Sequence, residues 1–380
     1  MINKKKLELY LHIPFCLRKC DYCDFLSGPA DEPVQEAYVR ALVRELEGRR
    51  AEGDGYEVVS VFIGGGTPSV LAPEWTELLM KTLEECYALS RNAEVTMEVN
   101  PGTVDPEKLV RYRRAGINRL SIGLQSALDE ELRRIGRIHS YGQFQEAYYG
   151  AREAGFTNIN VDVMSALPGQ GVEDYALTLK TVMGLTPPPE HISAYSLIVE
   201  EGTVFAQLDR AGKLNLPDED SERRMYELTG ELLAGAGYHR YEISNYAKRG
   251  YECRHNCGYW TRVDYLGFGT GAASLMENRR FSNGRGMEAY LENPLKVREN
   301  VQELTIQDQM EEFMFLGLRL TDGVSKSEFY GKFGLPMEEV YGEVLKRNRR
   351  DGLLEEEGEF VRLTARGIDV SNYVMAQFLF

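Results

Sequence analysis

The sequence predicts an α/β fold, a partial (β/α)6 barrel followed by a smaller C-terminal domain of helical, winged-helix-like character. Up to about residue 200, short β-rich runs alternate with amphipathic helical runs, and strands that alternate with helices form parallel sheets. Beyond that point the alternation stops. Six β-rich runs are visible, two short of a closed eight-fold barrel: Leu9–Ile13, Val58–Ile63, Val95–Val99, Arg119–Gly123, Asn158–Val163 and His191–Leu197.

Amphipathic runs between these strands predict the barrel helices. Pro73 and Pro106 stand in first-turn positions, where the missing N–H of proline costs nothing. The predicted helices are Pro33–Arg49, Pro73–Tyr87, Pro106–Ala115, Tyr141–Ala154 and Glu173–Met183.

In the second half of the chain, predicted strands and helices no longer alternate regularly. This half predicts a long helix over Asp218–Ala236, a strand over His239–Ser244 and a segment rich in glycine and aromatic residues up to Ser274. From about Glu303 it predicts three helices, a hairpin around Glu357-Gly358 and a final helix. We therefore divide the chain into a barrel domain (1–235), an extension (236–300) and a C-terminal domain (301–380).

A basic cluster in the C-terminal domain allows two interpretations. A winged helix with such a cluster could bind DNA. The other interpretation, a solvated helix end, is favoured because the chain as a whole is acidic. The cluster consists of Lys346, Arg347, Arg349 and Arg350.

Composition predicts a cytoplasmic protein. The 380 residues carry a formal net charge of −15, which repels nucleic acid, and we expect no nucleic-acid partner. No apolar run reaches the roughly 18 residues of a membrane span. The start, Met1–Lys6, is basic, but no continuous apolar core follows it, so we expect no signal peptide. In the cytoplasm thiols stay reduced, and clustered cysteines bind metal or act in catalysis.

Three of the six cysteines form the compact pattern Cys16-x3-Cys20-x2-Cys23 directly after the first predicted strand. Such a loop suits a [4Fe–4S] cluster, in which each thiolate binds a different iron corner. Three protein ligands leave one iron open, and Phe25 stands where a fourth cysteine could follow. The alternative is a structural zinc site with His12 as fourth ligand, but the second Cys or His pair typical of such sites is missing nearby.

Polar and glycine-rich groups stand where the other predicted strands end. The second strand leads into Gly64-Gly65-Gly66-Thr67-Pro68, a turn without bulky side chains. Glu98, Gln125 and Asp162 follow at the ends of the third, fourth and fifth strands. In a barrel these ends face one side, where ligands bind. Polar groups there are costly unless they are paired, so together they predict a ligand site.

The cysteine pattern on the first βα loop resembles the signature of the radical S-adenosylmethionine (SAM) superfamily. In that family the open iron binds SAM, and an electron from the cluster cleaves SAM to a radical. The resemblance implies that Glu98 and Asp162 hold the ribose hydroxyls and that Arg137 pairs with the SAM carboxylate. The full set of SAM-contacting residues that it implies is Tyr10, Gly65, Gly66, Thr67, Glu98, Gln125, Arg137 and Asp162.

Nearly the whole chain resembles the oxygen-independent coproporphyrinogen III oxidase group. Leu11–Cys16, Arg137–Ser140 and the C-terminal domain carry this similarity. True oxidases of the group have a fourth cysteine two residues after the third, at the position of Phe25 in this chain. The segment His255-Asn256-Cys257-Gly258-Tyr259-Trp260 instead resembles the HNxxYW motif of the HemW branch, the haem chaperones of the group.

This similarity implies a protein that binds haem and transfers it to an acceptor protein. His255 would bind the haem iron, and Tyr259 and Trp260 would offer flat apolar faces. In the alternative, His255 and Asn256 cap a turn while the two aromatic residues pack in the core. Covalent haem is not indicated, because no Cys-x-x-Cys-His motif is present.

Two other functions stay open at this point. The chain could be an oxidase that decarboxylates the propionates of coproporphyrinogen III, although Phe25 argues against it, or a radical enzyme with another substrate. Whether the protein is an enzyme is therefore undecided. Reduction of the cluster would require a low-potential donor such as a flavodoxin or ferredoxin.

Overall fold

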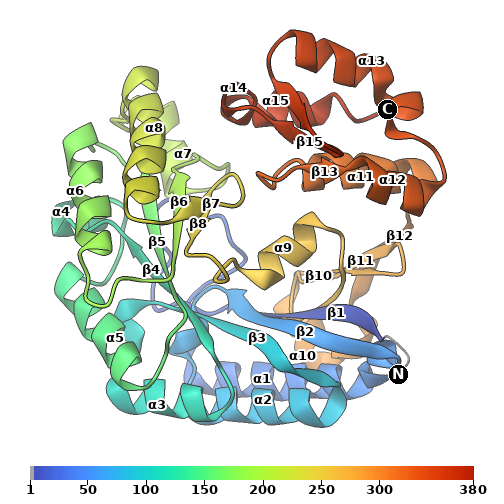
Figure 1. Ribbon diagram of the computed structural model, residues 1–380. Helices are drawn as coiled ribbons and strands as arrows, with labels where there is room; N and C mark the ends of the chain where they lie inside the picture. The colour runs from blue at the N-terminus through green and yellow to red at the C-terminus, as the bar shows by residue number, and fades with distance from the viewer. Residues whose placement is uncertain (1–3) are drawn as a thin grey trace.

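The computed structural model describes residues 4–380, so the basic start of the chain lies partly outside it. Its centre is a sheet with the strand order β12-β11-β10-β9-β1-β2-β3-β4-β5-β6-β8-β7. Six neighbouring strands of this sheet are parallel and coincide with the six predicted runs (Figure 1). They are β1 (Lys5–Ile13), β2 (Tyr56–Gly65), β3 (Leu89–Val99), β4 (Arg119–Gln125), β5 (Ile159–Ser165) and β6 (His191–Ser196).

Helices follow the strands and cover one face of the sheet (Figure 1). The five predicted barrel helices and the long helix after residue 218 are all present, whereas the short α4 and α7 were not predicted. The helices of this part are α1 (Glu32–Gly48), α2 (Pro73–Cys86), α3 (Pro106–Arg114), α4 (Asp129–Arg134), α5 (Tyr141–Glu153), α6 (Val172–Met183), α7 (Val204–Arg210) and α8 (Glu219–Gly235). The 3₁₀ helices within residues 4–380 are short: η1 (Arg50–Gly53), η2 (Pro68–Val70), η3 (Pro101–Thr103) and η4 (Pro294–Lys296).

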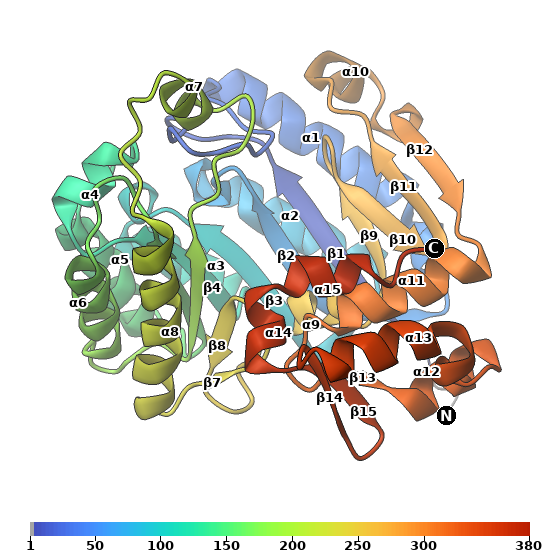
Figure 2. The same cartoon turned by 90° about the horizontal axis from the view of Figure 1, so that it is seen from above.

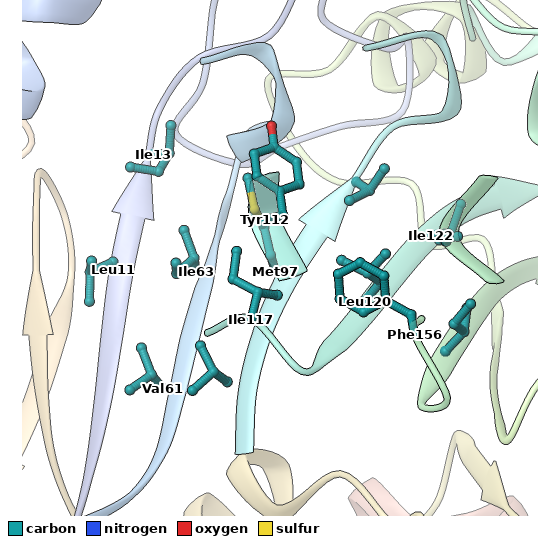
Figure 3. Close-up of a cluster of buried hydrophobic side chains, with 14 of the residues drawn as sticks. Leu11, Ile13, Val61, Ile63, Met97, Tyr112, Ile117, Leu120, Ile122 and Phe156 are labelled. Carbon is teal, nitrogen blue, oxygen red and sulfur yellow. The ribbon is translucent and has the colours of Figure 1, made fainter. Parts of the chain in front are cut away.

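The parallel strands have one apolar and one polar face, because successive side chains point to opposite sides of a sheet. On the apolar face Leu11, Ile63 and Met97 pack with Tyr112 of α3 in the buried core (Figure 3). Parallel strands with helices on both faces are usually apolar throughout. Here the second face carries buried polar residues. Glu8, Ser60 and Glu94 are paired across β1, β2 and β3, and Asn160 is paired with His191 across β5 and β6. Arg119 on β4 is also buried. This polar inner face forms the wall of the partial barrel.

Further strands extend the sheet at both edges. The predicted strand over His239–Ser244 is wrong in its length, because the chain turns at Glu242, whose Oε1 accepts a hydrogen bond from the Ser244 N–H at 2.8 Å. The edge strands are β7 (His239–Arg240) and β8 (Asn245–Ala247) beside β6, and β9 (Asp264–Phe268), β10 (Ala273–Met276), β11 (Arg279–Asn283) and β12 (Arg298–Glu303) beside β1. Two short helices, α9 (Arg254–Trp260) and α10 (Met287–Glu292), lie in this stretch.

The C-terminal part, orange to red in Figure 2, has a hydrophobic core of its own. This core includes Met314, Phe329 and Tyr341. Its predicted three helices and hairpin are present, and the predicted final helix is divided into two. The elements are α11 (Ile306–Gly317), β13 (Val324–Ser325), α12 (Lys326–Phe333), α13 (Met337–Arg350), β14 (Leu354–Glu357), β15 (Phe360–Leu363), α14 (Ala365–Asp369) and α15 (Ser371–Ala376). The predicted α/β class with a small helical C-terminal domain is thus confirmed.

The basic cluster of this part lies at the end of α13. Arg349 forms an ion pair with Glu356 at 2.7 Å, and Arg350 pairs with Asp351 at 3.1 Å. These positive side chains are therefore partly neutralised, at a helix C-terminus where the backbone dipole favours them. The proposed domain boundaries at residues 235 and 300 stay a prediction. Across residues 4–380 no helix is both long and apolar enough to cross a membrane.

Candidate functional site

The loop after β1 places its three cysteines around a cavity of about 470 Å³ at the C-terminal ends of the parallel strands. Backbone hydrogen bonds fix this loop: Cys16 N–H donates to Gly28 O at 3.0 Å, and Cys23 N–H donates to Cys20 O at 3.2 Å. The loop also meets α7, where Phe205 N–H donates to Asp21 O at 3.0 Å (Figure 2). All three thiols are free and half-buried. The cavity thus has three thiols on its wall, as a cluster site requires.

The glycines after β2 form a cradle beside Cys16. A Cβ at position 66 would lie 3.0 Å from Cys16 Sγ and 2.7 Å from Phe15 O, so only glycine fits this approach. Gly65 has a φ of 114°, which is accessible to glycine alone without strain. Thr67 Oγ1 donates to Cys16 Sγ at 3.4 Å and would support a thiolate there. The backbone is thus open to a ligand where the sequence predicted it.

Two carboxyl groups line the same cavity. Glu98 on β3 accepts a hydrogen bond from Gly65 N–H at 3.0 Å. Burial, reinforced by the nearby Asp162 charge, raises the pKa of Glu98 to about 8. Burial also raises the pKa of Asp162 on β5, which accepts from Asn160 Nδ2 at 2.6 Å. Two partly buried acids that face one cavity raise the free energy of the protein, and a ligand with hydroxyl groups would offset this cost.

Arg137 and Gln125 bring unsatisfied polar atoms to this cavity. The guanidinium of Arg137 donates to Gly123 O and lies 3.9 Å from Cys20 Sγ, but its Nε is buried without a partner. Gln125 adopts a left-handed φ of 73°, and its buried Oε1 is also unpartnered. Strained backbone and unpaired buried groups cluster at ligand sites. Both residues therefore fit a polar ligand bound next to the cysteines.

Tyr10 lies outside the cysteine cavity. It lines a neighbouring cavity of about 500 Å³, which shares Asp24, Phe25, Gly65 and Glu98 with the first. The Tyr10 hydroxyl is 3.0 Å from His12 Nδ1, and His12 Nε2 is 2.9 Å from Leu26 O. Both nitrogens of His12 are therefore engaged, which removes the fourth ligand of the zinc alternative. In residues 4–380 no three His, Cys, Asp or Glu side chains converge on a single metal position.

Two tyrosines in the cavity were not predicted. Tyr195 is at the end of β6, and Tyr22 lies between Cys20 and Cys23, with its ring against Phe205 of α7. The signal for Tyr195 was its position at the C-terminal end of a barrel strand. Nothing in the sequence indicated Tyr22, because α7 was not predicted.

The segment with the HNxxYW pattern forms α9, which packs on the polar inner face of the sheet (Figure 1). It contacts Glu8, Ser60 and Glu94, which are paired across β1, β2 and β3. These residues precede Tyr10 and Glu98 in their strands and lie near the middle of the strands. The cysteine loop leaves from the C-terminal end of β1. The α9 segment therefore packs against the middle of the strands and contributes no residue to the cysteine cavity.

His255 is enclosed, with 1% of its surface exposed. Its Nδ1 is 2.9 Å from Ser60 Oγ, and its Nε2 is 3.0 Å from the Tyr259 hydroxyl. The ring stacks on Phe62 at a centroid distance of 5.2 Å. Burial, with the Arg119 charge adding to it, lowers the pKa of His255 to about 3. In this conformation neither nitrogen is available to iron, and its role as a haem ligand stays a prediction.

Three contacts hold α9 in place. Glu94 Oε1 accepts from the N–H groups of Arg254 at 3.0 Å and His255 at 3.4 Å, and so caps the helix. At position 258 a Cβ would collide with the Glu8 carboxyl group, so glycine permits the close packing. On the far side Arg319 lies over the Trp260 ring at 4.3 Å. The helix is thus fixed between the barrel wall and the C-terminal part.

Comparison with known proteins gives consistent matches. The Radical SAM superfamily matches residues 10–182, and the HemN C-terminal domain matches residues 304–370. The heme chaperone HemW of Bacillus subtilis is 39% identical over 97% of this chain and 98% of its own length. The proteins of the same name from Lactococcus lactis and Escherichia coli are each 36% identical, over 99% and 100% of this chain.

A solved structure has the same fold over almost the whole chain. Coproporphyrinogen III oxidase (HemN) from Escherichia coli, described as a radical SAM enzyme, superposes with a TM-score of 0.86. The match covers 99% of this chain and 90% of that one at 25% identity. The fold is therefore shared with an oxidase, whereas the sequence is more similar to the HemW proteins.

Proposed function

Because this chain belongs to the heme chaperone HemW family, on a radical SAM scaffold, we propose that it binds haem and transfers it to an acceptor protein. One observation carries this proposal: the identity to HemW proteins of several bacteria extends over essentially the whole length of both chains. The oxidase alternative is less favoured, because HemN has lower identity and because Phe25 stands where true oxidases have a fourth cysteine.

The family implies a [4Fe–4S] cluster and SAM, and the cysteine cavity fits both. We assign the cluster to Cys16, Cys20 and Cys23, which the first loop holds on the cavity wall beside the Gly66 cradle. When bound, a cluster of this kind supplies an electron that can cleave SAM at the open iron. The protein's own part is to present three thiolates and to keep one side of the cluster free of side chains.

For SAM itself we propose charge-assisted contacts from the groups that lack partners. Arg137 Nε would donate to the SAM carboxylate, and the unpartnered Gln125 Oε1 would accept from a donor on the ligand. Glu98 and Asp162 would hold the ribose hydroxyls. Gly65, Gly66 and Thr67 would lie against the methionine end, and Tyr10 would contribute from the adjoining cavity that shares Glu98.

Substitution of these residues should weaken SAM binding and leave the cluster intact. We expect Arg137→Ala to lower SAM affinity by about ten- to a hundred-fold, because a charge-assisted hydrogen bond in a buried site is lost. Glu98→Ala should also weaken binding. Isothermal calorimetry on reconstituted protein measures the affinity, with iron content checked in parallel. Arg133→Ala, an exposed arginine without a side-chain partner in residues 4–380, is the matched control. Parent-like affinity in both variants would refute the assignment.

Three further parts of the function are proposals on chemical grounds. Reduction of the cluster requires a low-potential donor, such as a flavodoxin or ferredoxin. The acceptor of haem would be a protein that stores or uses it. We place the activity in the cytoplasm, where the cysteines stay reduced.

The two candidate functions predict opposite results in one experiment. Anaerobically reconstituted protein is titrated with haem and, in parallel, incubated with coproporphyrinogen III, SAM and a reductant. We expect a saturable shift of the Soret band, release of haem to added apomyoglobin, and no protoporphyrinogen. Catalytic consumption of coproporphyrinogen III by the unmodified protein would overturn the chaperone function.

A further inference from the structure

Large apolar side chains gather unburied at the mouth of the cysteine cavity. Phe25 is 58% exposed and Ile198 is 68% exposed, and both line the cavity together with the partly exposed Tyr195. Leu17, next to Cys16, is 56% exposed. They come from two segments far apart in the sequence, the cysteine loop and the end of β6. A group of exposed apolar side chains around one opening marks a binding surface.

Positive charge accompanies these apolar side chains. Arg18 and Lys19 are exposed and line the same cavity, in a chain with a net charge of −15. The Lys19 ammonium donates to Phe25 O at 2.8 Å, whereas Arg18 has no hydrogen bond or ion pair within residues 4–380. Asp24 and Glu200 also line the cavity, so the stretch with Arg18 and Lys19 is where an anionic group can bind.

Haem has the complementary chemistry, a flat apolar macrocycle with two carboxylates at one edge. We propose that haem lies across the mouth of the cysteine cavity, with its macrocycle against Phe25, Tyr195 and Ile198 and a propionate on the Arg18 guanidinium. This placement rests on the proposed haem binding and names its site. It differs from the prediction for His255, which is enclosed and has both ring nitrogens engaged. Haem at the mouth would cover a SAM molecule bound in the cavity below it. The affinity of the protein for haem should therefore change when SAM is bound.

The two sites make different demands on the ligand. Binding at the mouth depends on the macrocycle and the carboxylates, so iron-free protoporphyrin IX should bind within about three-fold of haem. Binding through His255 depends on the iron, and the iron-free porphyrin should then bind far more weakly. Titration of the reconstituted protein with both porphyrins, followed by fluorescence quenching, separates these possibilities.

Variants of the mouth complete the test. Phe25→Ala and Ile198→Ala should each weaken both porphyrins by about five- to ten-fold through lost apolar contact. Arg18→Ala should weaken them by about three- to ten-fold, and this loss should vanish with porphyrin whose propionates are esterified. Phe360→Ala on β15 and Arg366→Ala on α14 are matched controls, because both residues are exposed and neither lines the cavity. Iron and sulfide contents must equal those of the parent.

Two results would contradict the placement, and they are distinguishable. If the parent binds haem while Phe25→Ala, Ile198→Ala and Arg18→Ala bind it equally well, the site is elsewhere, and loss in His255→Ala would assign it to α9. If the parent shows no saturable haem binding, the proposed function itself fails, and the placement fails with it. Ile198 lies outside the cysteine loop, so its variant remains informative if Phe25→Ala disturbs that loop.

Discussion

Alanine at Cys16, Cys20 or Cys23 is expected to abolish the iron–sulfur cluster. Anaerobically reconstituted parent protein should contain about four irons and four sulfides per chain, and each single variant close to none. The reason is geometric, because one short loop supplies all three thiols and the cavity wall offers no further cysteine to replace a lost one. Chemical analysis of iron and sulfide, with the broad visible absorption of the cluster, measures the outcome.

Matched controls exist in the same chain. Cys86 closes α2 and packs against the core, and Cys257 lies in α9, outside the cysteine cavity. Cys86→Ala and Cys257→Ala should keep full iron and sulfide content. Stoichiometric zinc with little sulfide in the parent would overturn both the cluster and the radical SAM chemistry. Normal cluster content in Cys20→Ala would move that ligand to another residue.

The sequence predicted the barrel well because its signals are local. The strands β2 to β5 each combine an apolar run with a polar or glycine residue at or near the C-terminal end, and Glu98 and Asp162 could be located from that pattern. The edge strands were less predictable. β7 and β8 have only two and three residues, so their formation depends on pairing with β6 rather than on their own sequence.

The predicted site was incomplete for a related reason. Tyr10 matches the family pattern, but its side chain faces a neighbouring cavity that β11 and β12 help to enclose. No sequence pattern indicated that the strands β9–β12 extend the sheet beside β1. The position of His255 depends on long-range contacts to Ser60, Glu94 and Glu8. A signal was present, since Glu8 and Ser60 interrupt apolar strands and require a polar partner. The partner, α9, is about two hundred residues away in the chain.

The packing of α9 predicts a large effect for a small substitution, Gly258→Ala. The added methyl group would collide with the Glu8 carboxyl, which is enclosed and therefore cannot turn away. Burial raises the pKa of Glu8 to about 9, so this group is neutral at pH 7 and packs as a fixed wall. We expect a loss of about 1–3 kcal/mol in the free energy of unfolding, measured by urea denaturation. Gly342→Ala in α13, where a Cβ meets open space, should instead stabilise by up to about 1 kcal/mol.

A double-mutant cycle identifies the cause of this loss. In a Glu8→Ala background the methyl group has room, so Gly258→Ala should cost at least about 1 kcal/mol less than in the parent. Displacement of α9 should also change the fluorescence of Trp260, which lies under Arg319, in a Trp75→Phe protein where it is the remaining tryptophan. Iron content should not change, because α9 contributes no residue to the cysteine cavity. If Gly258→Ala lowers the free energy of unfolding equally in both backgrounds, α9 does not pack on Glu8.

The haem affinity of Gly258→Ala distinguishes the two haem sites. It should equal that of the parent if haem binds at the mouth of the cysteine cavity. Tighter binding of haem by Gly258→Ala would mean that His255 becomes a ligand once α9 is released.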